Sequence, residues 1–408
     1  MKFSSNSADI LPDDIIQEGL MAGNILYVNP VINHGATSIR AGWAARMVID
    51  GRLSRMPVII GYQKLDTPIR KSTGQPNLSA CLALEKKMIL NTQPKGEDIL
   101  KVVGAGFPGA WLENGRVYPN TVNTNRELED FPLALKFSAM MGKGWEIVVN
   151  NDAVAHALAI SQGFVADIDR FPAAGRVLEK TGKIVVLMPA TGFGGGAFIY
   201  KKGSLTAVDG PVQFFDIALE EGDGVIDPNH RFLTPEDVAA GAGVSFQMRG
   251  SFLKDRYSEV QLSTQNAGSL LVRMAFSKED GIKADEREFA LSLYAKAAKG
   301  LAKTMWLING GIIEGEHRKL VVNDPPSLET DFWESIKGTR VIILGGWLTH
   351  PDVKAYMKRA LREELDALGL FNVGFIFADD IAGVDAMVEN DTIGLAGAAM
   401  LAWSRIGA

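Results

Sequence analysis

The sequence predicts an α/β protein made of two lobes, each with a mixed sheet flanked by helices. Short apolar runs rich in β-branched residues are followed by longer helical patterns, and this succession occurs twice along the chain. The length of 408 residues fits two or three domains better than one, and 47% hydrophobic residues can fill a sizeable core. No fixed period of about 20–50 residues recurs, so a short repeat array is not expected.

In the first half, strand-like segments are separated by turn residues such as Asp50-Gly51. We expect strands over residues 25–32, 39–49, 57–62, 98–106 and 145–150, a hairpin over 111–118, and helices over 78–90, 126–141 and 152–162. Asn77 stands before the first of these helices and is expected to cap it.

The second half repeats this alternation of strands and helices. We expect strands over residues 183–188, 197–200, 341–344 and 373–378, and helices over 235–254, 258–277, 285–309, 351–368 and 392–404. The strand before residue 191 and the strand before residue 345 both end in glycine-rich segments, which are the first candidates for a functional site.

Composition limits the classes of function and partner. The net charge of -6 argues against a nucleic-acid-binding surface. No run of about 18 apolar residues occurs, so no membrane span is expected. The N-terminus lacks a basic segment followed by an apolar one, which favours a cytoplasmic protein. The single cysteine, Cys81, excludes an intramolecular disulfide and a multi-cysteine zinc site, and we expect no bound structural metal.

The glycine-rich segment at residues 191–196 reads Thr-Gly-Phe-Gly-Gly-Gly and joins two strand-like runs. Glycines let backbone N–H groups converge without interfering side chains, and such a nest can hold phosphate oxygens. The alternative is a tight β-hairpin without a ligand, which is equally compatible with the pattern.

An aspartate lies at a predicted strand-to-helix junction, in the segment Asn150-Asn151-Asp152. A carboxylate placed there can act as the general base that phosphoryl transfer needs to accept a hydroxyl proton. The alternative is a helix cap, which is the commoner role of an aspartate at a helix start.

Two further segments fit nucleotide binding. Gly345-Gly346 follows a buried strand, and ligands of open α/β sheets lie beyond the carboxyl ends of the strands. Residues 33–37, Asn-His-Gly-Ala-Thr, lie between two N-terminal strands and can form a second phosphate hairpin. A plain strand-to-helix turn is the alternative for the first segment.

The order of these pieces resembles the ROK family of sugar kinases, which belongs to the actin, sugar-kinase and Hsp70 superfamily. A phosphate hairpin, a Gly-x-Pro-Gly turn at residues 106–109, an Asn-Asp helix start, a Thr-Gly-x-Gly-Gly-Gly hairpin and a strand ending in Gly-Gly occur in the family's order. Residues 390–399 are also similar to the family's C-terminal helix. The similarity covers about residues 31–45, 101–162, 184–250 and 340–402.

This resemblance implies a two-lobed actin-like fold, also called ribonuclease H-like, with a central cleft. We expect a smaller α/β domain over residues 1–150, with a C-terminal helix in 391–408 packing back on it. The larger domain, over 151–390, would hold the nucleotide hairpin and the adenosine site.

The resemblance also implies a role for each matching residue. Asp152 would be the catalytic base, and Asn151 would bind a sugar hydroxyl. The other implied substrate ligands are Glu236, Asn120 or Asn123, and Gly109. The residues implied to bind ATP are Gly35 and Thr37 in the first hairpin, Thr191, Gly192, Gly194 and Gly195 in the second, and Gly345 and Gly346 beside the adenosine.

The sequence departs from the family's pattern at several places. The family usually has an aspartate, which helps to handle magnesium, where this chain has Asn33, and a glycine where it has Ala36. The cysteine-rich zinc motif is absent, and residues 211–215 stand in place of the Gly-Glu-Ile-Gly-His sugar motif. Two insertions, 163–182 and 312–338, have no counterpart in the family.

The sequence thus predicts an ATP- and Mg²⁺-dependent kinase of a sugar or polyol, acting as a homodimer on a small-molecule substrate. A non-catalytic sugar or nucleotide sensor is the main alternative, and an ATPase without an acceptor sugar is another. His156, four residues after Asp152, shares its helix face and can contact the base, although a partly buried helix histidine is the commoner case. His34 can touch phosphate on the same terms.

Overall fold

A computed structural model provides the structure of the chain. It describes residues 25–35, 38–49, 51–68, 77–94, 99–108, 132–208, 219–221, 232–278, 281–310, 335–371 and 373–405. The chain forms two compact units, one comprising Met1–Asp167 with Ile381–Ala408 and the other Ile168–Asp380. The sequence predicted domain limits at residues 150 and 390. In the structure, residues 151–167 and 381–390 also belong to the first unit.

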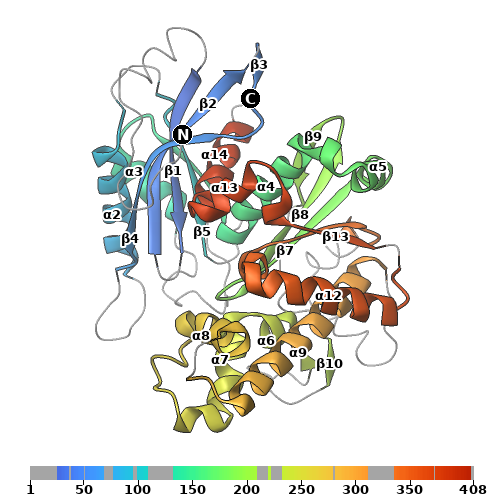
Figure 1. Ribbon diagram of the computed structural model, residues 1–408. Helices are drawn as coiled ribbons and strands as arrows, with labels where there is room; N and C mark the ends of the chain where they lie inside the picture. The colour runs from blue at the N-terminus through green and yellow to red at the C-terminus, as the bar shows by residue number, and fades with distance from the viewer. Residues whose placement is uncertain are drawn as a thin grey trace. The chain divides into compact units, whose positions relative to one another are not determined.

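The first unit contains a mixed sheet in the order β3-β2-β1-β5-β6, with β4 paired to β2 (Figure 1). The strands are β1 (Ile25–His34), β2 (Ser38–Ile49), β3 (Arg52–Leu53), β4 (Val58–Asp66), β5 (Val102–Phe107) and β6 (Glu146–Asn151). β1, β2 and β4 form an antiparallel meander, whereas β5 runs parallel to both β1 and β6. The carboxyl ends of β1, β5 and β6 therefore lie at one edge of this sheet.

Helices cover both faces of the first sheet because its strands alternate their side chains between two apolar layers. Ile32 packs in the layer shared with α2 (Leu78–Asn91) and α3 (Leu133–Met141), and its neighbour Val31 packs in the opposite layer with α14 (Ile393–Arg405). Figure 1 shows α2 and α3 on one side of the sheet and α14 and α4 on the other.

The helix α4 (Asp152–Ala166) packs against α14, which packs in turn against the sheet. Glycines at both contacts allow short distances between these elements. A β-carbon on Gly104 of β5 would lie 1.8 Å from the Ala398 carbonyl oxygen, and one on Gly397 would lie 1.7 Å from the Ala155 carbonyl oxygen. Both helices and the strand thus approach to backbone contact, which only a residue without a side chain permits.

The second unit contains a sheet in the order β13-β12-β7-β8-β9. The strands are β7 (Lys183–Pro189), β8 (Phe193–Lys201), β9 (Ser204–Ala207), β12 (Val341–Leu344) and β13 (Gly374–Phe377). β7, β12 and β13 are parallel, and β7, β8 and β9 form an antiparallel meander. A separate pair, β10 (Glu220–Glu221) and β11 (Phe232–Leu233), is antiparallel.

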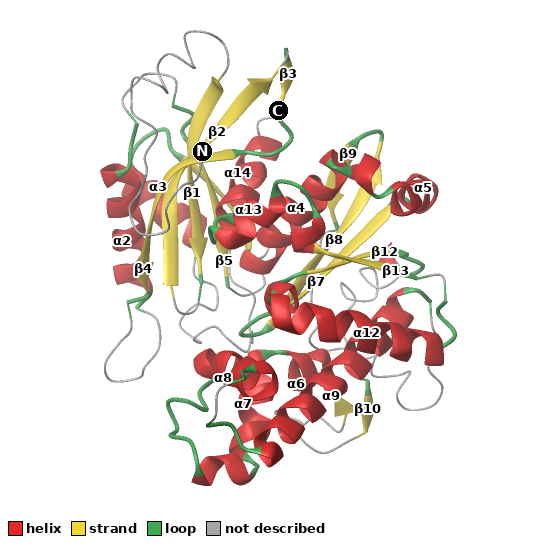
Figure 2. Cartoon of the chain, viewed as in Figure 1, coloured by secondary structure: helices red, strands yellow, loops and turns green. Residues whose placement is uncertain are grey.

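A large apolar core of the second unit involves α6 (Pro235–Ala239), α7 (Gly241–Arg249), α8 (Thr264–Phe276), α9 (Ala284–Ile308) and α12 (Pro351–Ala367) (Figure 2). The unit also contains α5 (Pro172–Thr181), which contributes no residue to this core, and α13 (Val384–Glu389) belongs to the first unit. Tyr294 of α9 lies inside this core, where burial raises its phenol pKa well above the ordinary value.

The single helix predicted over 235–254 is wrong, because the chain breaks at Ala240. Thr234 and Asp237 form a capping box that starts α6, and Ala240 is extended with ψ 159°. The N–H groups at the start of α7 donate instead to the loop between β7 and β8, from Gly241 to the Ala190 carbonyl over 2.8 Å. Tertiary hydrogen bonds thus replace the helical ones that would have continued α6.

Other boundaries shift by a few residues. The helix predicted from residue 258 begins at Thr264, and the strand predicted from residue 197 begins at Phe193 because Gly194 to Gly196 pair with β7. The insertion 163–182 contains the end of α4, a short 3-10 helix (Ile168–Arg170) and α5. The predicted hairpin at 111–118 and most of the insertion 312–338 lie outside the described residues.

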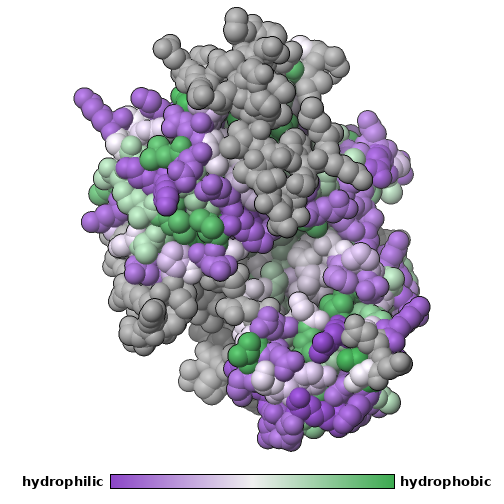
Figure 3. Space-filling model, turned by 60° about the vertical axis from the view of Figure 1, so that its left-hand side comes forward, coloured by the Kyte–Doolittle hydropathy of each residue, from purple (hydrophilic) through white to green (hydrophobic). Residues whose placement is uncertain are grey.

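The described surface is mixed in character. Figure 3 shows one face on which hydrophobic residues lie in small groups among hydrophilic ones. The exposed apolar side chains include Leu90 of α2 and Leu135 of α3. Among the described helices, none combines the length and the apolar character that crossing a bilayer requires.

Replacing Gly397 by alanine is expected to lower the free energy of unfolding of the first unit by about 1–3 kcal/mol, the usual cost of overpacking. The added β-carbon would lie 1.7 Å from the Ala155 carbonyl oxygen and force α14 away from α4. Urea unfolding followed by circular dichroism measures the change.

Gly268→Ala is the matched control, because a β-carbon on this helical glycine meets open space. It should leave stability unchanged or raise it by up to about 1 kcal/mol through helix propensity. An equal loss in both variants would contradict the packing argument.

Candidate active site

The candidate site of the first unit lies at the carboxyl ends of β1, β5 and β6. Asn33 of β1 pairs with Gly106 of β5, and Gly106 pairs in turn with Asn150 of β6. Parallel strands that end in register bring these positions together at one edge of the sheet, which is where ligands of open α/β sheets bind. The Asn-Asp segment singled out in the sequence begins at this edge.

Asp152 is the first residue of α4, as the sequence predicted. The helix cap is the preceding residue, Asn151, whose side-chain oxygen accepts the Ala153 N–H at 2.9 Å. The Asp152 carboxylate accepts from the same N–H, also at 2.9 Å. A β-carbon on Gly106 would lie 3.1 Å from the Asp152 Cα, so glycine at that position lets the helix start lie close to β5.

The pKa of Asp152 lies above the ordinary carboxyl value, and the main cause is desolvation. The residue is half-buried at the start of α4. His156, the hydrogen bond from Ala153 and His34 act in the opposite direction and are outweighed. A carboxylate with a raised pKa is a stronger base than a free one, which suits proton abstraction from a hydroxyl.

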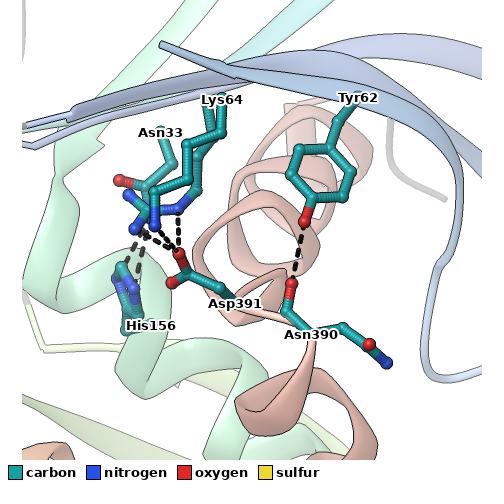
Figure 4. A network of polar contacts seen from close by, with 7 residues as sticks. Asn33, Tyr62, Lys64, His156, Asn390 and Asp391 are labelled. Atoms are coloured by element: carbon teal, nitrogen blue, oxygen red, sulfur yellow. Dashed lines mark hydrogen bonds and ion pairs between the residues drawn. The ribbon is translucent and has the colours of Figure 1, made fainter. Parts of the chain in front are cut away.

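The His156 side chain contacts the backbone of Asp152. The Nδ1 atom lies 2.7 Å from the Asp152 carbonyl oxygen, one turn earlier in α4. The Nε2 atom lies 3.3 Å from the Asn33 amide nitrogen (Figure 4). His156 and Asp152 therefore share a helix face and are in contact, as predicted. Asn33 of β1 contacts the same His156 ring.

His34 points to the opposite side of β1. Its Nδ1 atom lies 2.6 Å from Glu85 Oε1 of α2, and its ring stacks on Phe107 with centroids 4.5 Å apart. Both residues of the pair are buried, and desolvation raises the pKa of the Glu85 carboxyl against the lowering effect of His34. The His34 side chain therefore lies inside the α2 layer, as the commoner case of a partly buried histidine implies.

A cluster that sequence analysis missed fixes the start of α14. Asp391 accepts from Arg40 Nε at 2.8 Å and from Lys64 Nζ at 2.7 Å, and Tyr62 donates to the Asn390 carbonyl at 2.9 Å (Figure 4). Asp391 adopts the left-handed conformation, with φ 57°. Burial alone would raise the pKa of Asp391, but the hydrogen bonds and charges of Lys64 and Arg40 hold it below the ordinary value.

In the second unit, the predicted glycine loop is a tight hairpin between β7 and β8. Gly194 and Gly195 lie within β8, opposite Met188 and Leu187, so the turn itself comprises residues 190–192. Thr191 is exposed at the turn, and Gly192 is half-buried. Gly194 and Gly195 pair with β7 on one side, and β9 pairs with β8 only from Phe198 on, so their implied role toward ATP stays a prediction.

The side chain of Glu236, in α6, accepts a hydrogen bond from this hairpin. Its Oε2 atom accepts the Phe193 N–H at 2.5 Å, while the Thr191 carbonyl accepts from Ala242 of α7 at 3.0 Å. The residue that the resemblance implied for sugar binding thus contacts the hairpin between β7 and β8 in the structure. Its role toward a sugar stays a prediction.

Gly345 and Gly346 lie at the same edge of the second sheet as this hairpin. The Gly345 N–H donates to the Leu187 carbonyl at 2.9 Å. Gly346 has φ +64°, and a β-carbon there would lie 2.0 Å from the Pro189 carbonyl oxygen. Both glycines therefore bring the chain after β12 into backbone contact with the end of β7. The structure joins the two glycine motifs that the sequence placed far apart.

Comparison of the sequence with family models and with curated proteins finds no match. Comparison of the structure with solved structures does find matches. A ROK hexokinase from Thermus thermophilus is 18% identical, with a TM-score of 0.53, and the match covers 93% of this chain and 99% of that chain. The chain has the fold of the ROK sugar kinases.

Two further solved structures agree. A ROK family glucokinase from Streptomyces griseus, in complex with glucose and AMPPNP, is 16% identical with a TM-score of 0.52, and the match covers 92% of this chain and 99% of that chain. A glucokinase from Balamuthia mandrillaris, in complex with glucose, is 13% identical with a TM-score of 0.56, and the match covers 96% of this chain and 98% of that chain. The predicted α/β class and the predicted resemblance to ROK kinases are thus confirmed.

Within this ROK fold, several implied site residues lie outside the described part of the chain, namely Thr37, Gly109, Asn120 and Asn123. Gly35 is described and forms the turn of the first hairpin, where its N–H donates to the Ser38 carbonyl at 2.9 Å. Among the described residues, no group of at least three histidine, cysteine or acidic side chains that could hold a metal ion occurs.

Asp391→Asn is expected to lower the free energy of unfolding at neutral pH by about 1 kcal/mol, because it removes a partly exposed charge held by two cations. The folded pKa lies below the unfolded value of 3.8. The stabilisation is therefore present above about pH 5 and is lost as the pH falls through the folded pKa. Thermal midpoints of both proteins between about pH 3 and 7 measure it.

The difference between the two proteins should shrink toward the acid end of this series. In an Arg40→Met background, the effect of Asp391→Asn should also be smaller, since one of the two cations is gone. A constant difference across the pH series would contradict the assigned ion cluster.

Proposed function

We propose that the chain is a kinase that transfers the γ-phosphoryl group of ATP to a hydroxyl of a sugar or related polyol. The carrying observation is Asp152, a carboxylate with a raised pKa at the strand-edge position of a ROK fold. A ROK neighbour that is in complex with glucose and AMPPNP supports both substrate classes.

In this proposal Asp152 removes the proton from the attacking hydroxyl. Phosphoryl transfer needs the acceptor oxygen in line with the phosphorus and a carboxylate to take its proton. The double hydrogen bond from the Ala153 N–H to Asn151 and Asp152 fixes the first turn of α4. The Asp152 carboxylate is therefore held in one orientation at the sheet edge. The adjacent residue, Asn151, is the proposed ligand of a sugar hydroxyl.

The nucleotide would bind to the second unit. The exposed turn at Thr191 and Gly192 offers a hydroxyl and backbone groups to the phosphates. Gly345 and Gly346 offer backbone without β-carbons to the adenosine, beside the same turn. Mg²⁺ would come with the substrate as MgATP, since this ion is usually held by one or two carboxylates and the substrate's phosphates. Homodimer formation stays a prediction.

A sensor that binds sugar or nucleotide without turnover is the second candidate. The observation that favours it is Asn33, a neutral amide that faces His156 where the ROK resemblance implies an aspartate. Nucleotide binding by calorimetry, without ADP release across hexoses, amino sugars and polyols, would select this candidate.

Asp152→Asn is expected to reduce sugar-dependent ADP release by about 10²–10⁴-fold, the usual contribution of a general base. A coupled ADP-release assay with MgATP and the sugar panel measures it. For the wild type, kcat/KM should fall at acid pH along a limb that lies above pH 3.8, because Asp152 must be deprotonated to act and its pKa is raised.

Asp169→Asn is the control, because this exposed aspartate lies in the short helix that follows α4. It should keep wild-type activity. Full activity of Asp152→Asn would refute the assigned base.

Gly346→Ala is expected to weaken AMPPNP binding about tenfold, because an alanine is strained at φ +64° and its β-carbon would displace the end of β7. Isothermal titration calorimetry measures the dissociation constant. Gly338→Ala separates strain from displacement, since Gly338 has φ +79° and open space around its β-carbon. It should bind AMPPNP like the wild type, and equal binding by all three proteins would count against an adenosine site at Gly346.

A further inference from the structure

A chain of three residues connects β1 with the proposed base. Asn33 of β1 is 2% exposed, and its amide nitrogen lies 3.3 Å from Nε2 and 3.5 Å from Nδ1 of His156. The Nδ1 atom lies 2.7 Å from the Asp152 carbonyl oxygen. Figure 4 shows the Asn33 and His156 side chains facing one another.

The chemistry of one partner assigns one proton of His156. A carbonyl oxygen only accepts, so Nδ1 must carry hydrogen and donate it to Asp152 over 2.7 Å. The Asn33 amide nitrogen is nearly equidistant from the two ring nitrogens, at 3.3 and 3.5 Å, so it packs against the ring and does not lie along the lone pair of Nε2. Asn33 thus fixes the position of the ring, and the Asp152 carbonyl fixes which nitrogen donates.

The neighbouring helix is shaped to this pair. A β-carbon on Gly394 of α14 would lie 1.4 Å from the Asn33 amide nitrogen and 2.5 Å from His156 Cε1. Only glycine at this position leaves room for the amide and the ring to meet. The turn that leads into α14 is in turn held by Asp391 with Arg40 and Lys64. Three elements thus converge on one contact between an amide and an imidazole.

This contact bears on the base through the backbone of α4. The Asp152 carbonyl belongs to the same residue as the proposed catalytic carboxylate, and the His156 ring binds it at 2.7 Å. Because the ring is itself fixed by Asn33, the first turn of α4 is tied to the end of β1. A displacement of about 1 Å at a reacting group is enough to reduce a rate strongly.

We propose that His156, held by Asn33, is a positioning residue that orients the base Asp152 for proton abstraction. This inference rests on the proposed kinase function. It assigns His156 no contact with the sugar or the nucleotide, so substitutions there should change the catalytic step and leave substrate binding intact.

Three substitutions at one position separate the two contacts. His156→Asn places an amide nitrogen near the position of Nδ1 and keeps the donor to Asp152. His156→Gln reaches the position of Nε2 and keeps a partner for Asn33, and His156→Ala removes both. We expect His156→Ala to lower kcat about tenfold with the sugar KM unchanged, because one hydrogen bond that orients the base is lost.

The expected rescue is asymmetric. His156→Asn should recover most of kcat, and His156→Gln should resemble His156→Ala, because the donor to Asp152 is the bond that acts on the base. Equal kcat in all four proteins, or a loss that appears only in the sugar KM, would overturn the positioning role. Thermal midpoints of the four proteins identify any variant whose loss comes from unfolding.

A measurement that needs no turnover tests the geometry directly. The chain has five histidines, so selective ¹⁵N-histidine labelling gives a simple spectrum, and His156→Gln assigns the His156 signals. We expect Nδ1 to carry hydrogen, because it donates to the Asp152 carbonyl. A ring that carries hydrogen only at Nε2 would overturn the inference. If the wild type releases no ADP but shows hydrogen on Nδ1, the kinase proposal fails and the arrangement stands.

Discussion

The close approach of α14 to β5 and α4 is the constraint on which the first unit depends. Gly104 and Gly397 let backbone meet backbone on two sides of this helix, and Gly394 leaves room for Asn33 and His156. Contacts at backbone distance allow little sliding, because each shift of the helix produces a clash rather than a looser fit. The position of α4, and with it Asp152 at its first residue, follows from this packing.

In the second unit, the hairpin between β7 and β8 is supported by hydrogen bonds from its backbone to neighbouring elements. Glu236 takes the Phe193 N–H, and the start of α7 donates to the carbonyls of Ala190 and Thr191. Gly346 brings the end of β12 against Pro189 from the other side. If the proposed nucleotide binds at this turn, these contacts preorganise it and reduce the cost of ordering the turn on binding.

Two pairs of polar side chains lie on opposite faces of β1 in the first unit. Asn33 meets His156 on the α4 side, and His34 meets Glu85 on the α2 side. Burial of unpaired polar groups costs free energy, so each pair is a strong restraint on the strand end that carries both residues. The same desolvation that makes these pairs necessary raises the pKa of Asp152, which connects the packing of the sheet edge to the chemistry proposed for it.

The sequence by itself determined the α/β class, most helices and strands to within a few residues, the place of Asp152 at a helix start, and the glycine-rich ends of β7 and β12. These features are local, because they depend on hydrophobic periodicity, turn residues and short motifs. Only the tertiary structure decided which residues meet: Arg40 with Asp391 is separated by 351 positions, Asn33 with His156 by 123, and Glu236 with Phe193 by 43. Such pairs leave no periodic signal in the chain, since they arise when packing brings distant elements to one place.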